Sequence, residues 1–151
     1  MEDLEQIVAL EAIRRLKYRY CHLLDAKDWD QYATIFTEDG AADLREAGPA
    51  GAPGMVLVEG RDAMMAYVKE AVKTLKTIHH VYSPLITFHG PDEATGVWQM
   101  DDRLLAPHGD GWSLVLQGYG HYHETYVKRS GQWLIHRLKL TRTHVEYGPA
   151  V

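Results

Sequence analysis

The first 25 residues carry apolar side chains at steps of three and four, with Glu, Arg and Lys between them. This spacing predicts an α-helix with a single apolar stripe. The stripe comprises Ile7, Leu10, Ile13, Leu16, Tyr20, Leu23 and Leu24. A short second helix is predicted at about 28–36, where three aromatic residues recur with helical spacing, and a third amphipathic helix at about 61–73. The helices therefore lie in the first half of the chain.

From residue 77 onward the period changes from 3.6 to 2, which indicates strands. Four runs, 78–89, 93–106, 112–128 and 132–145, are separated by the turn signals "HGPDE", "PHGDG" and "RSGQ". Weaker strands are expected near 41–44 and in "MVLVEG". Helices segregated from an antiparallel meander define the α+β class. We expect one domain over residues 1–151.

Composition narrows the function classes. The net charge of −5 favours neither nucleic acid nor an anionic membrane as partner, and no apolar run reaches the length of a membrane span. The single cysteine, Cys21, excludes an internal disulfide and a Cys-based zinc site, so a cytoplasmic protein is expected. The 9 Tyr, 4 Trp and 9 His suit a pocket for flat organic molecules, but such residues also fill cores.

Strand alternation assigns neighbouring polar residues to opposite faces. Of the adjacent pair His79 and His80, only one can face the interior. In "WQMDDRLL" the apolar neighbours Trp98 and Met100 favour Asp102 as the inward carboxylate. A carboxylate kept inside needs a partner, and Arg142 on the last strand is the natural candidate.

Three segments together resemble a known family. They are "AIRRLKYRYCHLLDAKDWDQYATIFTEDG", "TIHHVYSPLITFHGPDEATGVW" and "KRSGQWLIHRLKL". They are similar to SnoaL-like proteins of the nuclear-transport-factor-2-like (ketosteroid isomerase-like) superfamily. The resemblance implies a cone-shaped α+β barrel, in which three helices wrap a curved antiparallel sheet around one apolar pocket. Because this fold hosts unrelated chemistries and non-enzymes, it predicts the reaction less well than the fold.

Within the superfamily the motifs are most similar to lyases: scytalone dehydratase, bile-acid 7α-dehydratase and hexachlorocyclohexane dehydrochlorinase. The resemblance implies an Asp at the end of the first helix and a His on the following long strand, with a Tyr, a second acid and an Arg. The matching catalytic positions are Asp25, His79, Tyr20, Asp102 and Arg142. His79 is then the inward histidine and His80 the outward one.

The chemistry of these residues supports a general base. The helix dipole and burial both disfavour a carboxylate at Asp25, so it should become more basic or pair with His79. A pair of this kind orients the imidazole and stabilises the imidazolium. Two alternatives remain open: Asp25 caps the loop "DAKDWD" beside a core histidine, or Tyr20 is a core aromatic rather than a proton donor.

Further residues are candidates for substrate contact. They are His121, His123, Trp98, Tyr119 and Trp29. His121 and His123 share one strand face and could join His79 and Asp25 around a metal, but H-x-H is an unspecific pattern, and polar lining of the pocket is preferred. We therefore expect neither metal nor cofactor.

The predicted function is a cofactor-independent lyase that eliminates water, formaldehyde or halide from a hydrophobic aromatic or polycyclic hydroxylated substrate. The alternatives are an isomerase or cyclase of a ketosteroid- or polyketide-like substrate, a non-catalytic binding or assembly domain, and the small subunit of a ring-hydroxylating dioxygenase. The resemblance also implies a homodimer or homotrimer formed through the convex face of the sheet, with Val115, Tyr126 and Leu134 among the candidate contacts.

Overall fold

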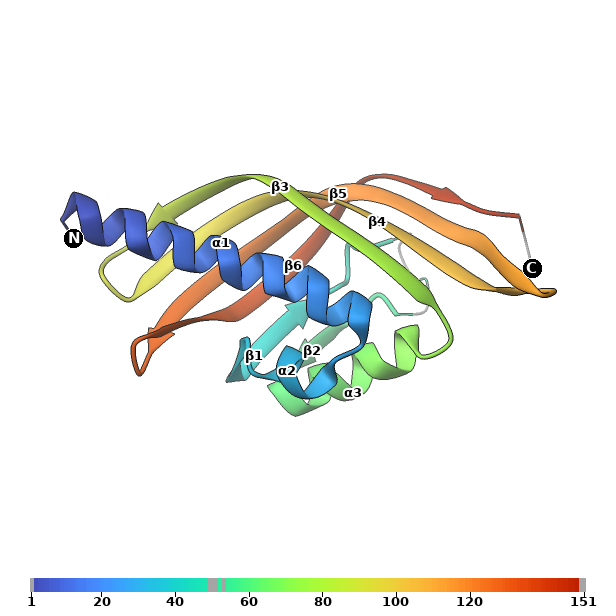
Figure 1. The fold of residues 1–151 in the computed structure, drawn as a ribbon, viewed down its shortest axis with the longest axis horizontal. Coiled ribbons are helices and arrows are strands. Elements are labelled where there is room, and N and C mark those ends of the chain that lie inside the picture. Colours follow the sequence, from blue (N-terminus) through green and yellow to red (C-terminus); the bar gives the residue numbers. More distant parts are fainter. Residues whose placement is uncertain (1, 49–51, 53, 150–151) are drawn as a thin grey trace.

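The computed structural model describes residues 2–48, 52 and 54–149. Three helices and six strands follow one another in an order close to the predicted one (Figure 1). They are α1 (Asp3–Ala26), α2 (Trp29–Ala33), β1 (Phe36–Asp43), β2 (Leu57–Glu59), α3 (Arg61–Val72), β3 (Lys76–Phe88), β4 (Glu93–His108), β5 (Gly111–Arg129) and β6 (Gln132–Tyr147). The α+β class is as predicted.

The six strands form one curved sheet in the order β2-β1-β6-β5-β4-β3. The predicted all-antiparallel sheet is wrong at one place, because β1 runs parallel to β6. The strands β3 to β6 are joined by short turns that can be recognised in the sequence. Strands β1 and β6 are neighbours in the sheet, but no turn joins them. A parallel pair needs a long crossover, and here the chain from β2 through β5 supplies it.

Helix α1 begins at a capping hydrogen bond and ends at a residue with left-handed backbone geometry. Glu5 accepts a hydrogen bond from the backbone N–H of Glu2 at 3.3 Å, and Lys27 ends the helix in the left-handed conformation (φ 55°). Its apolar stripe packs on the sheet from Ala9 onward. The predicted stripe is wrong at Ile7, which is 63% exposed, because the first turns of α1 carry no buried side chain.

The second helix is shorter than the predicted 28–36 and ends at Ala33. Asp28 caps it by accepting a hydrogen bond from the backbone N–H of Gln31 at 3.3 Å. The backbone C=O of Ile35 already accepts from the N–H of Ile135 in β6 at 2.9 Å, so the chain has entered the sheet by that point. Phe36 is therefore the first residue of β1 rather than the last of a helix.

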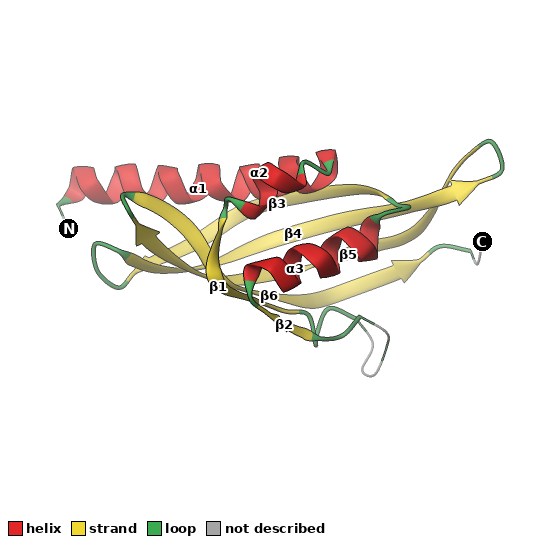
Figure 2. Ribbon diagram, turned by 90° about the horizontal axis from the view of Figure 1, so that it is seen from below, coloured by secondary structure: helices red, strands yellow, loops and turns green. Residues whose placement is uncertain are grey.

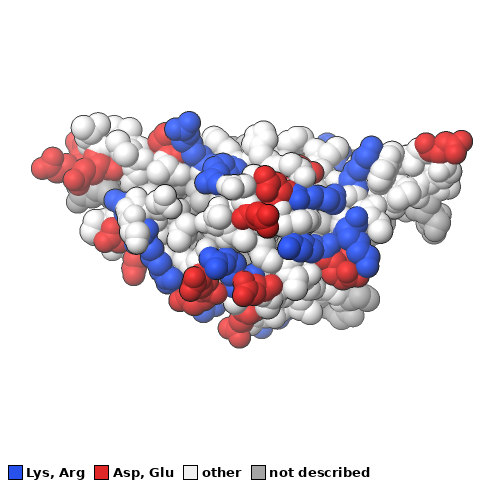
Figure 3. Space-filling model, turned by 60° about the horizontal axis from the view of Figure 1, so that its bottom comes forward, with Lys and Arg blue, Asp and Glu red and all other residues white. Residues whose placement is uncertain are grey.

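The two faces of the sheet differ in burial. The inner face carries Trp98, Met100, Tyr122 and Ile135, which are almost wholly buried against the helices. Figure 2 shows the three helices lying over this face. The outer face carries the alternate residues, and these are half-buried or exposed. On the side shown in Figure 3, basic and acidic side chains are interspersed. Within the described residues, no helix is long and apolar enough to cross a bilayer.

Candidate active site

The end of α1 and the start of β3 bring Asp25 and His79 together, as the sequence predicts. His79 Nδ1 lies 2.7 Å from Asp25 Oδ1, and the backbone N–H of His79 donates to Asp25 Oδ2 at 2.8 Å. The side chains are 9% and 26% exposed. One carboxylate thus holds both the ring and the backbone of the histidine, which fixes the ring orientation.

The chain connection beside this pair also constrains it. Lys27, directly after α1, donates from Nζ to the backbone C=O of Leu75 at 2.5 Å. Leu75 immediately precedes β3, which carries His79. This contact ties the helix end to the strand start. The spacing between Asp25 and His79 therefore depends on two rigid elements and not on a loop alone.

The Asp25 carboxylate is electrostatically stabilised. Burial pushes the pKa of this carboxyl upward, but the hydrogen bonds from His79 and Thr77 outweigh burial, and the pKa lies below its ordinary value. Of the two outcomes expected for a carboxylate at a helix C-terminus, pairing with histidine is the one observed. Asp25 is accordingly an ionised acceptor beside the imidazole.

His80 lies on the opposite face, as strand alternation predicts. Its side chain is 56% exposed, and Nδ1 contacts Asp101 Oδ1 at 3.0 Å. Asp101 also accepts from Arg103 Nη1 at 2.9 Å. His80 and Asp101 thus belong to a polar cluster on the outer face.

Asp102 and Arg142 form a buried ion pair on the inner face. Arg142 Nη1 and Nη2 donate to the two carboxylate oxygens of Asp102 at 2.7 and 2.9 Å, and the side chains are only 11% and 5% exposed. Gly118 on β5 makes room for the pair, since a Cβ there would lie 2.5 Å from Asp102 Oδ1. Asp102 is also the register partner of His79 across β3 and β4. The ion pair therefore stands in the row next to the histidine.

Tyr20 is both a core aromatic and part of a cavity wall. Its ring packs against Tyr32, Phe36 and Tyr122 with centroids 5.1–6.2 Å apart within the group. Burial raises the pKa of the Tyr20 hydroxyl well above its ordinary value, so it stays protonated. Tyr20 also borders an interior cavity of about 70 Å³ that α3 closes with Met64 and Met65.

Two charged residues inside the core were not predicted. Lys17 and Glu124 are fully buried, with Lys17 Nζ 2.5 Å from Glu124 Oε1 and 3.6 Å from the ring centroids of both Tyr20 and Tyr122. The spacing along α1 could have indicated that Lys17 is buried, because Lys17 occupies a position of the apolar stripe four residues after Ile13 and three before Tyr20. Glu124 likewise alternates in step with the buried Tyr122.

The candidate substrate-contact residues do not gather at the histidine. His121, His123 and Tyr119 lie on the outer face, because Tyr122 and Glu124 take the inner positions of β5. Their predicted place in the interior pocket is therefore wrong. The other two lie on the inner side, but apart from His79: Trp98 is fully buried and donates to Tyr126 Oη at 2.7 Å, and Trp29 packs edge-on against Tyr32. Tyr126 is equally buried, so it is not an outer-face contact residue.

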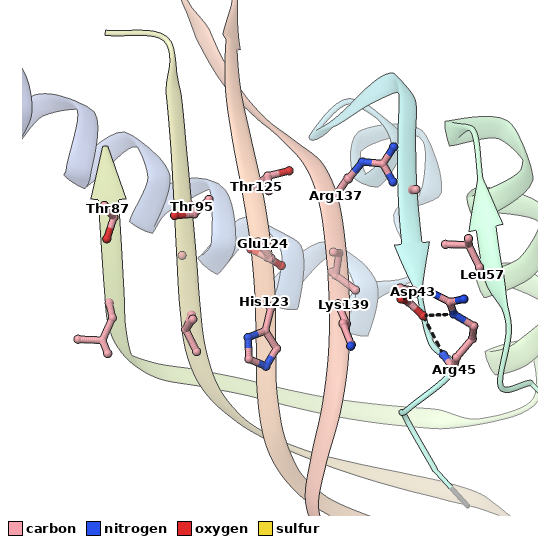
Figure 4. Close-up of a pocket in the computed structure, with 15 residues that line it drawn as sticks. Asp43, Arg45, Leu57, Thr87, Thr95, His123, Glu124, Thr125, Arg137 and Lys139 are labelled. Atoms are coloured by element: carbon pink, nitrogen blue, oxygen red, sulfur yellow. Dashed lines mark hydrogen bonds and ion pairs between the residues drawn. The ribbon is translucent and has the colours of Figure 1, made fainter. Parts of the chain in front are cut away.

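Of the larger pockets at the surface, two include residues considered above. One, of about 330 Å³, lies between α1 and β3. Its walls are Tyr18, Cys21, His22, Asp25, His79, His80 and Val81. The other, of about 540 Å³, lies on the outer face and includes His123, Arg137 and Lys139, with the Asp43–Arg45 pair at its edge (Figure 4). The lining of the larger pocket includes neither Asp25 nor His79, so size alone does not identify the site.

No three His, Cys, Asp or Glu side chains gather closely enough to hold a metal ion within residues 2–48, 52 and 54–149. The rings of His121 and His123 are 6.2 Å apart, on the face opposite to His79. The hypothetical four-residue metal site is therefore not formed.

Comparison with known proteins places this geometry in a family. The model of the SnoaL-like domain matches residues 5–139. A probable cyclase, FGR4, of Gibberella zeae is 26% identical over 144 residues, covering 90% of this chain and 92% of its own. A scytalone dehydratase-like protein of Novosphingobium aromaticivorans is 25% identical with a TM-score of 0.80, covering 99% and 94% of the two chains.

A hexachlorocyclohexane dehydrochlorinase, LinA-type3, of Novosphingobium barchaimii is 18% identical with a TM-score of 0.77, covering 99% and 95% of the two chains, and at this identity it shows the fold alone. The family match extends over most of the chain, and the solved structures agree with its curved sheet and helices. The chain belongs to the SnoaL-like domain family.

Proposed function

We propose that this protein is a cofactor-independent lyase that eliminates a small molecule, most simply water, from a hydrophobic hydroxylated substrate. The observation that carries the proposal is the contact of 2.7 Å between His79 Nδ1 and Asp25 Oδ1. An imidazole that donates from Nδ1 to a carboxylate presents Nε2 as a proton acceptor, and the carboxylate stabilises the imidazolium that forms.

The reaction can be written with the residues of this chain. His79 Nε2 takes a proton from a substrate carbon, and the electron pair of that C–H bond forms the new C=C bond. The C–O bond to the leaving group breaks, and the departing oxygen receives the proton back from the imidazolium of His79. Proton and hydroxyl leave together as water, so no oxidant or reductant is needed.

The buried Asp102–Arg142 pair supports this assignment. A non-catalytic binding domain has no need to keep charged groups next to a histidine in a largely apolar interior, since burying them is costly. The register places Asp102 beside His79, where the pair can orient polar substrate groups. The substrate needs several hundred Å³. The pocket of about 330 Å³ bordered by Asp25 and His79 approaches that size, whereas the interior cavity of about 70 Å³ must open to admit one.

A second candidate is isomerisation or cyclisation, which the similarity to the probable cyclase favours. The same histidine would then move a proton without loss of a fragment. Incubation with panels of hydroxylated aromatic and polycyclic ketones, followed by mass spectrometry, separates the two candidates. A product lighter by one water supports the lyase, a product of unchanged mass supports the isomerase, and no turnover on any panel member counts against both.

Mutagenesis tests the base itself. His79→Ala should lower kcat by about 10²–10⁴-fold, and Asp25→Asn should cost nearly as much because it favours the wrong tautomer. The double variant should be hardly worse than His79→Ala, since the two side chains act as one unit. His80→Ala is the matched control, because it removes an exposed imidazole next in sequence and should have little effect. Losses that multiply in the double variant would contradict the proposal.

A further inference from the structure

Thr77 lies two residues before His79 on β3, so both side chains point to the inner face. Thr77 is only 6% exposed, and its hydroxyl donates to Asp25 Oδ1 at 2.8 Å. The hydroxyl therefore contacts the same carboxylate that holds the histidine.

The oxygen that Thr77 contacts is the one that His79 uses. Asp25 Oδ1 lies 2.8 Å from Thr77 Oγ1 and 2.7 Å from His79 Nδ1, while Oδ2 accepts the backbone N–H of His79. Three donors from one strand therefore fix both oxygens, and the carboxylate cannot rotate without losing at least one of them. β3 is an edge strand of the sheet. The backbone N–H of His79, which has no neighbouring strand to bond, is therefore satisfied by Asp25 Oδ2.

We propose that Thr77 is a positioning residue of the His79–Asp25 pair, whose hydroxyl keeps Asp25 Oδ1 in line with His79 Nδ1 and keeps the carboxylate ionised during proton transfer. This inference rests on the proposed function, because it assigns Thr77 to the same base. The hydroxyl donates a hydrogen bond to the carboxylate oxygen and so stabilises its negative charge, and a hydrogen bond to an ionised acceptor is one of the stronger ones in proteins.

The electrostatic contribution of Thr77 has the direction that the proposal requires. Its hydrogen bond is among the causes that hold the pKa of Asp25 below the ordinary value, against the upward push of burial. Other titratable groups surround Asp25. They are His79 and His80 on β3, Tyr18, Cys21 and His22 on α1, Lys27 after it, and Asp102 on β4. A substitution at Thr77 leaves all of them in place, so a comparison of Thr77 variants isolates the hydroxyl.

Two substitutions separate the hydroxyl from the shape of the side chain. Thr77→Val removes the hydroxyl and keeps the branched shape, whereas Thr77→Ser keeps the hydroxyl and removes a methyl group. The first readout needs no substrate: the ¹³Cγ signal of Asp25, assigned with Asp25→Asn, is followed by NMR as pH falls. Thr77→Val should raise the pKa of Asp25 above that of the wild type, and Thr77→Ser should not.

The second readout is kinetic, with whichever panel substrate the wild type converts. Thr77→Val should lower kcat by about 10-fold, which is the loss of one hydrogen bond to a charged group, and should change KM by less than about two-fold. The acid limb of its kcat/KM profile should move to higher pH, while Thr77→Ser retains the wild-type profile. If Thr77→Val does not fold, Thr77→Ala serves as the hydroxyl-free variant.

The two readouts fail independently. Equal behaviour of Thr77→Val and Thr77→Ser in the Asp25 titration would overturn the inference, whatever the enzyme does. A wild type that converts no substrate would overturn the proposed function, while the NMR comparison would still show whether the hydroxyl controls the carboxylate.

Discussion

Removing the ammonium of Lys17 should destabilise the fold strongly, because it would leave Glu124 as an unpaired charge in the core. Both side chains have no solvent exposure, and their contact is 2.5 Å. After Lys17→Met, Glu124 would retain one hydrogen-bond donor, the Tyr126 hydroxyl at 2.5 Å from Oε2. Breaking a buried pair on one side costs about 3–5 kcal/mol. For a domain of this length, that loss corresponds to a fall in Tm of roughly 6–20 °C.

The double variant Lys17→Met/Glu124→Gln tests the cause. It removes both charges, keeps the length of the side chain at 124 and shortens that at 17 by one atom, so it should recover most of the lost stability, since buried pairs are often replaceable by neutral groups. Urea unfolding followed by tryptophan fluorescence measures the free energy of unfolding, because Trp98 is joined to the same hydrogen-bond chain through Tyr126. The recovery on removing the second charge distinguishes electrostatic loss from loss of packing.

An exposed ion pair provides the matched control. Lys73 and Glu70 form a contact of 2.6 Å on α3, with side chains 60% and 73% exposed. Lys73→Met should change the free energy of unfolding by less than about 1 kcal/mol. The reasoning is refuted if Lys17→Met costs no more than this control, or if the double variant is as unstable as Lys17→Met alone.

Four other predictions concern the site and the assembly. Gly118→Ala should displace the Asp102–Arg142 pair and destabilise the protein by about 1–3 kcal/mol, measured by urea unfolding, because the added Cβ overlaps both partners. Asp25 should stabilise the fold above pH 4, since its pKa is lowered on folding; the stability gap between wild type and Asp25→Asn should shrink as pH falls below about 4 toward the folded-state pKa. We expect a homodimer or homotrimer by light scattering at micromolar concentration and full activity after exhaustive chelation; a monomer, or activity restored by one divalent metal, would contradict these expectations.

Much of the fold was predictable because the signals are local. The change of period at residue 77 and the turn signals gave the meander, and alternation separated His79 from His80. The parallel pairing of β1 with β6 was not predictable in this way, since it depends on a contact between distant segments that no turn announces.

The site was predictable in part for the same reason. Alternation correctly grouped His121 with His123, but period alone does not say which of two faces is buried. The inner face of β5 carries Tyr122 and Glu124, so His121 and His123 lie on the outer face. Glu124 is tolerated in the core because Lys17, on a helix distant in sequence, neutralises its charge. A charged residue within an apolar stripe is interpreted as solvent-exposed as long as its partner is unknown. The buried pair Lys17–Glu124 was therefore not predicted.

The pairing of β1 with β6 also has a consequence for how the chain assembles. Phe36 and Ile135 are register partners although nearly a hundred residues separate them, whereas β3 to β6 are joined by short turns. Contacts between sequence-distant segments are slow to form, so the hairpins should assemble first and β1 should dock last. On a ribosome, β1 must wait for the last strand to emerge, and until then its side chains that end up buried, Phe36 among them, are open to chaperones and to other nascent chains.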